Sequence, residues 1–72
     1  MKTADEMFKE LGYEKILKSN KIIYRIKHGI LIPDTEIIFD CKNKWISTNF
    51  ISLDIKELYA INKKIKELKW NE

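Results

Sequence analysis

Residues 36–50, EIIFDCKNKWISTNF, decide the fold of this 72-residue chain. β-Branched and aromatic residues alternate with polar ones on both sides of Asn43-Lys44, a pair that favours a turn. This period of two is typical of a β-hairpin. A two-residue turn at this pair predicts three cross-strand pairs with all six side chains on one face: Cys41 with Ile46, Phe39 with Thr48, and Ile37 with Phe50.

A second hairpin is predicted upstream, around Ser19-Asn20. Its register gives three further cross-strand pairs: Leu17 with Ile22, Lys15 with Tyr24, and Tyr13 with Ile26. The same register sets Lys18 against Lys21, which is unfavourable. The apolar run within residues 28–34 ends at a proline, so we interpret it as a strand end followed by a connection.

A short amphipathic helix is predicted before the strands. Thr3 and Glu6 form the T-x-x-E pattern of a capping box. Gly12 stands where the end of a helix needs a left-handed residue. One apolar stripe lies between these signals, at helical spacing: Ala4, Met7, Phe8 and Leu11.

A longer helix is predicted after the strands. Asp54 and Glu57 repeat the capping signature, and Leu53 with Leu58 has the spacing of a hydrophobic staple. An apolar stripe is expected to face the sheet: Ile55, Leu58, Ile61, Ile65 and Leu68. The sequence therefore predicts one α+β domain over residues 1–72, a four-stranded antiparallel meander with a short N-terminal and a longer C-terminal helix, in the order α-β-β-β-β-α.

The composition indicates a compact globule. The chain is 44% hydrophobic, and its net charge of +3 comes from fourteen basic and eleven acidic residues, so most positive charges have a counterpart of opposite sign. A lone cysteine suits a reducing compartment. No segment has the apolar length of a membrane span or a signal peptide. We expect a cytoplasmic protein that does not enter the membrane.

The sheet face opposite the predicted core carries four large apolar side chains: Ile16, Ile23, Ile38 and Trp45. An apolar patch of this kind usually marks an interface. Either the first helix covers this face or a second copy of the chain does. We favour a homodimer with Trp45 as its anchor, and the alternative is one helix on each face of the sheet.

The last helix offers another candidate surface. Tyr59, Lys63 and Lys66 gather on one side, joined by Trp70 if the helix extends that far. Aromatic side chains among lysines can bind a protein partner or stack on bases. The simpler interpretation is favoured, in which both aromatics border the core and the lysines are solvated surface.

The sequence gives no constellation for catalysis, metal binding or cofactor binding, so we expect a protein that is not an enzyme. His28 is the only histidine, and Cys41 has the parity of a small buried apolar residue. The two glycines form no phosphate-binding loop. The candidate nucleic-acid contacts are Arg25 and Lys27, with Lys18 and Lys21 near the start of the same strip. Glu14 is placed to pair with the arginine.

Three segments together resemble a family of small phage and prophage proteins of Gram-positive bacteria: ADEMFKELGYEK (4–15), EIIFDCKNK (36–44) and ELYAINKKIKELKW (57–70). The family has a helix ending in Leu-Gly-Tyr, an I-x-F-D strand and a final L-x-A-I-N-K-x-I-x-E-L-x-W helix. This chain departs at Lys69, where the family has Gly. The resemblance implies a phage accessory protein acting inside a bacterial host cell.

From these patterns we expect a non-enzymatic interaction module that binds a host or defence protein through Trp45 or through the last helix. The alternatives are weak nucleic-acid binding, or an oligomer that sequesters a small nucleotide-like ligand between subunits. If the protein binds nucleic acid, its affinity should fall steeply as the salt concentration rises.

Overall fold

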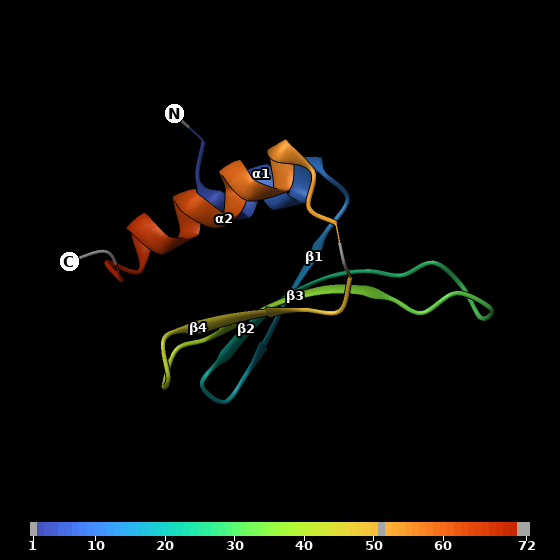
Figure 1. Cartoon of the computed structure of the whole chain (residues 1–72), viewed down its shortest axis with the longest axis horizontal. Helices are drawn as coiled ribbons and strands as arrows, with labels where there is room; N and C mark the ends of the chain where they lie inside the picture. The colour runs from blue at the N-terminus through green and yellow to red at the C-terminus, as the bar shows by residue number, and fades with distance from the viewer. Residues whose placement is uncertain (1, 51, 71–72) are drawn as a thin grey trace.

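The computed structural model describes residues 2–50 and 52–70 and confirms the predicted α+β class (Figure 1). Its elements are α1 (Ala4–Glu10), β1 (Glu14–Lys18), β2 (Lys21–Ile26), β3 (Thr35–Asp40), β4 (Trp45–Thr48) and α2 (Ile55–Glu67). The strands form one antiparallel sheet in the order β1-β2-β3-β4, which is the expected meander.

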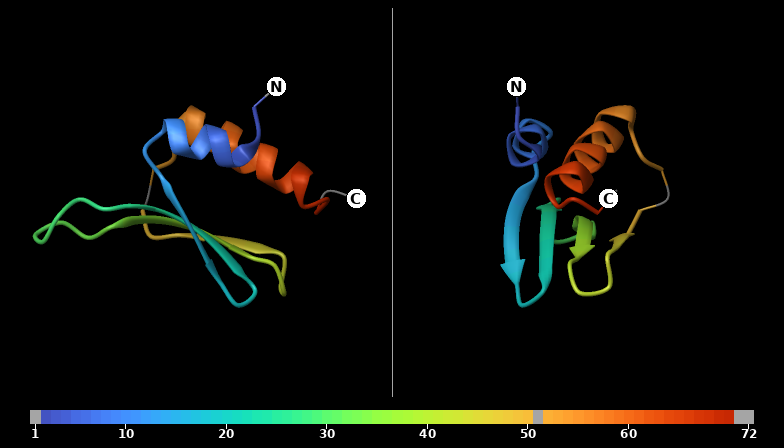
Figure 2. Two further views of the ribbon diagram at one scale, coloured as in Figure 1. Left: turned by 180° about the vertical axis from the view of Figure 1, so that it is seen from behind. Right: turned by 90° about the vertical axis from the view of Figure 1, so that its left-hand side faces the viewer.

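Both helices lie on the same face of the sheet (Figure 2). The alternative in which α1 covers the opposite face, so that one helix lies on each side of the sheet, is therefore wrong. The reason is Phe8, which stacks on the Tyr24 ring with centroids 4.0 Å apart and meets Phe39 edge-on at 6.2 Å. Ala60 and Ile61 of α2 close the same core. One apolar cluster thus holds both helices and the sheet.

The first hairpin has the predicted register. Leu17 pairs with Ile22 and Lys15 with Tyr24. Lys18 does face Lys21, but Lys21 also lies opposite Asp40 on its other side. An acidic neighbour across the next strand offsets the repulsion between the two lysines.

The second hairpin is shifted by two residues from the prediction. Phe39 lies opposite Ile46, not Thr48, and the loop comprises four residues, 41–44. The Asp40 carboxylate organises this loop by accepting the backbone N–H groups of Lys42 and Asn43, both at 3.1 Å. Because side chains alternate along a strand, a shift of two leaves every residue on its predicted face.

The apolar stripe of α2 is rotated from the predicted one. Ile55 and Leu58 are exposed, whereas Ala60 and Lys64 are buried beside Ile61. The prediction assumed that α2 packs against the sheet alone. Much of its buried side instead contacts α1, and the small Ala60 allows the two helices to approach closely.

Both helices end in the same way. Gly12 and Lys69 adopt left-handed conformations, with φ of 97° and 60°. The next residue then bonds back into the last turn, with Tyr13 N donating to Phe8 O at 2.9 Å and Trp70 N donating to Ile65 O at 3.1 Å. These are the bonds of a Schellman motif. The helix therefore stops before Trp70, whose ring lies 6.1 Å from that of Phe39.

Lys69→Gly should stabilise the protein. A side chain in the left-handed region costs about 1 kcal/mol, and glycine removes that cost, so the free energy of unfolding should rise by about this amount. Chemical denaturation monitored by tryptophan fluorescence measures the change. Lys66→Gly is the matched control, because glycine within the helix should lower stability by about 0.5–1 kcal/mol. A loss of stability in both variants would contradict the assigned helix end.

Candidate functional site

The residues singled out from the sequence lie on separate surfaces. One is the sheet face that no helix covers, here called the open face, which is defined by Ile16, Ile23, Ile38 and Trp45. The three isoleucines form one cross-strand row, in which Ile23 at the centre is buried by its neighbours. Trp45 is 59% exposed. Trp45 is therefore the side chain of this face that most readily contacts a partner.

Asp40 holds the Trp45 ring in place. The indole Nε1 donates to the Asp40 carboxylate at 2.8 Å, and Asn43 donates to the same carboxylate through its backbone and side-chain nitrogens. The hydrogen bonds from Asn43 and Trp45 lower the pKa of Asp40 below its ordinary value, with the Asn43 backbone N–H as the largest cause. An exposed aromatic side chain with a fixed orientation loses little freedom on binding.

The second surface is a hollow of about 540 Å³ between α1 and α2. It brings together Tyr59, Lys63 and Lys66, as the sequence predicted. Trp70 lies elsewhere, against the core, because the helix ends before it. The hollow also includes residues that the sequence did not suggest: Lys2, Met7 and Asn62.

An adjoining hollow shares part of this lining and extends the surface along the helix pair. Its additional members are Glu10, Leu11 and Lys56. We call the combined surface the helix groove. Its lining has four lysines, 2, 56, 63 and 66, against one glutamate, Glu10, so its formal charge is +3. Met7, Leu11 and Tyr59 give it an apolar floor.

The two candidate nucleic-acid contacts do not form a joint basic patch. Glu14 faces Arg25 across the strands, as expected, but the arginine Nε donates to Glu36 at 2.7 Å and lies 3.8 Å from Asp34. Lys27 is exposed in the connection that follows β2. The arginine charge is thus matched by acidic neighbours.

A third surface was missed from the sequence. The β2–β3 connection, residues 27–34, projects beyond the helices as an arm (Figure 1). Ile30 is fully exposed, Leu31 is 95% exposed and Ile32 is also exposed. The available signal was an apolar run between Gly29 and Pro33, in a connection too long for a tight turn.

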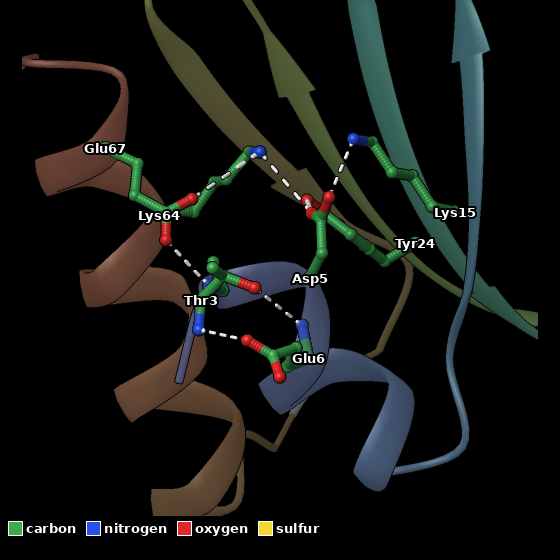
Figure 3. A network of polar contacts seen from close by, with 8 residues as sticks. Thr3, Asp5, Glu6, Lys15, Tyr24, Lys64 and Glu67 are labelled. Atoms are coloured by element: carbon green, nitrogen blue, oxygen red, sulfur yellow. Dashed lines mark hydrogen bonds and ion pairs between the residues drawn. The ribbon is translucent and has the colours of Figure 1, made fainter. Parts of the chain in front are cut away.

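A polar cluster joins the two helices to the sheet (Figure 3). Asp5 accepts the Tyr24 hydroxyl at 2.6 Å and Lys15 Nζ at 2.8 Å. The Lys64 ammonium lies 3.5 Å from Asp5 and 3.9 Å from Glu67. Glu67 in turn accepts the Ala4 backbone N–H at 2.7 Å. Nothing in the sequence distinguished Lys64 from its exposed lysine neighbours.

The protonation states of this cluster favour a structural role. Partial burial alone would raise the pKa of Asp5, but the hydrogen bonds from Lys15 and Tyr24 and the charge of Lys64 lower it below its ordinary value. Burial, and then the bond to Asp5, raise the pKa of the Tyr24 hydroxyl well above its usual range. The carboxyl therefore stays ionised and the phenol neutral, in mutually satisfied bonds.

Other chemistry-bearing residues are dispersed. His28 Nε2 lies 2.7 Å from Thr35 Oγ1, and the thiol of Cys41 is half-buried in the β3–β4 loop, not within the strand as predicted. Within residues 2–50 and 52–70, no three His, Cys, Asp or Glu side chains gather as metal ligands. Over the same residues, none of the helices has the length and apolar character needed to cross a bilayer.

No family model, curated protein or solved structure matches the chain. The resemblance to phage and prophage proteins therefore stays a prediction. The arguments for function come from the surfaces of the molecule itself.

Asp5→Asn should reduce the acid sensitivity of the protein. Because the pKa of Asp5 is lowered on folding, its ionised form stabilises the native state above the ordinary value of 3.8, and this stability is lost as the pH falls through the native pKa. At neutral pH, the free energy of unfolding of Asp5→Asn should be about 1 kcal/mol lower than that of wild type, a figure that allows for solvent screening. On acidification, the free energy of unfolding should fall less in this variant than in wild type. Urea unfolding at several pH values measures both effects.

Glu10→Gln is the control for this prediction. Glu10 pairs with Lys2 on the surface at 2.6 Å, with both side chains more than half exposed. Such a pair contributes little to stability. Equal acid sensitivity of wild type and Asp5→Asn would contradict the role assigned to the cluster.

Proposed function

We propose that this protein is a non-enzymatic interaction module whose helix groove binds an acidic segment of a protein partner. The single observation that carries the proposal is Tyr59, an aromatic side chain 59% exposed to solvent in a groove lined by four lysines and one glutamate. Tyrosine is enriched among the residues that contribute most to the binding energy of protein interfaces.

The shape of the groove supports the same class of partner. Two antiparallel or crossed helices form a shallow trough, and amphipathic segments bind such troughs through apolar anchors spaced along one face. Met7 and Leu11 could receive these anchors from the α1 side, opposite Tyr59 on α2. Carboxylates of the bound segment would then lie near Lys56 and Lys66 at the rim.

The resemblance to phage and prophage proteins suggests where the partner would be found. On that basis we propose a host or defence protein inside a bacterial cell. The affinity should arise from a few anchors, with the lysines mainly accelerating association.

Binding can be tested with a fluorescein-labelled amphipathic helical peptide composed of leucine and glutamate. We expect saturable fluorescence anisotropy that weakens as salt rises, because the contacts at the rim are screened. Tyr59→Ala and Lys66→Glu should each weaken binding about tenfold or more. Amide shifts in the ¹H–¹⁵N spectrum should map to the groove.

Two controls make this experiment decisive. Lys44→Glu makes the same charge change in the β3–β4 loop, outside the groove, and should bind as wild type does. A peptide with lysine in place of glutamate should not bind. Equal loss of binding in Lys44→Glu and Lys66→Glu would mean that net charge, and not the groove, attracts the peptide.

A further inference from the structure

The tip of the arm is the most exposed apolar segment in the described chain. Ile30, Leu31 and Ile32 are consecutive, and all three are exposed to solvent. Large aliphatic side chains seldom lie together in this way on the surface of a monomer. Hydrophobic burial would therefore favour a partner that covers the tip.

The arm is held in position at its base. Asn49 accepts the Glu36 backbone N–H at 2.8 Å and donates to the Asp34 carbonyl at 2.6 Å. His28 lies within hydrogen-bond distance of Thr35 across the arm. These contacts orient the arm as a continuation of β2 and β3.

Within residues 2–50 and 52–70, no other segment of the chain covers the tip. Both helices lie over the other part of the sheet, and the arm extends past them in Figure 1 and in the left view of Figure 2. The helices also leave the open face of the sheet uncovered. Ile23 and Ile38 of the open face lie on β2 and β3, the two strands from which the arm extends, whereas Trp45 lies opposite Asp40 at the other end of β3. One partner that runs along this face could therefore cover both the tip and Trp45.

The size of the two surfaces favours covering them together. A stable interface takes about 800 Å² from each partner, which is far more than three aliphatic side chains provide. The open face adds Trp45 and the partly exposed Ile16 and Ile38, which lie on either side of the buried Ile23. Chains near the lower size limit of a folded domain often gain stability by association, and here only a few large side chains are fully buried.

The charges indicate that the partner is a second copy. Two charged rows flank the isoleucine row on the open face. One charged row consists of Glu14, Arg25 and Glu36, and the other consists of Lys18, Lys21 and Asp40. Three basic and three acidic groups give this face no net charge, so two identical faces can meet without net repulsion. The helix groove, at +3, would repel its own copy.

We propose that two copies of this chain form a symmetric dimer through the open face and the arm, with Trp45 and the tip of the arm both inside the interface. In a two-fold contact each copy presents the same patch to the other, so both arms are covered at once. This inference does not depend on the helix groove, which lies on the other side of the molecule.

Sedimentation equilibrium of the full chain over a wide range of concentration tests the proposal. Wild type should be a dimer. Leu31→Glu and Trp45→Ala should each raise the dissociation constant about tenfold or more. Because Leu31 is almost completely exposed, its substitution should leave the far-ultraviolet circular dichroism unchanged. Peptide binding to the groove should also persist in Leu31→Glu.

Leu17→Glu is the matched control. Leu17 is 69% exposed on β1, on the face opposite Trp45, and its substitution should leave the dimer intact. A wild-type chain that is monomeric at every concentration would overturn the proposal, and so would a dimer that Leu31→Glu does not weaken. Flotation of monomeric wild type with anionic phospholipid vesicles, lost in Leu31→Glu, would assign the tip to a lipid surface instead.

Discussion

The architecture depends on neutralising the ammonium of Lys64, which is buried where the two helices meet the sheet. Burying this ammonium without an opposite charge nearby would be unfavourable. Asp5 from α1 and Glu67 from α2 supply the opposite charges, and the ammonium also lies 5.9 Å from the centre of the Tyr24 ring. These ion pairs hold α1 beside α2. Together with the stacking of Phe8 on Tyr24, they keep both helices on one face of the sheet and leave the other face open.

Local signals in the sequence predicted the elements well, because their causes are local. Thr3 and Glu6 make the capping bonds expected of them, and the first hairpin keeps the register of a two-residue turn. The register of the second hairpin differed from the prediction because a side chain stabilises a longer loop. The Asp40 carboxylate accepts hydrogen bonds from the loop backbone and fixes four residues outside the ladder. Hydrophobic alternation alone contains no such information.

The candidate surfaces were predictable to different degrees. The grouping of Tyr59 with Lys63 and Lys66 follows from helical geometry and was found. The opposing wall from α1 was not, because its position depends on contacts between elements distant in the sequence. Lys64 was missed for the same reason, since its burial depends on Asp5, fifty-nine positions earlier. Exposure of the arm became visible only once both helices were placed on one face.

The shared ending of the two helices has a consequence for how the chain tolerates change. At each end one aromatic residue, Tyr13 or Trp70, both follows the left-handed residue and packs against the core. At each of these positions, the same residue therefore completes the hydrogen bonds that end the helix and fills part of the core. A substitution there would remove two constraints together. The exposed residues of the arm and the lysines of the groove have no such second role, so new binding specificities could evolve there while the scaffold stays the same.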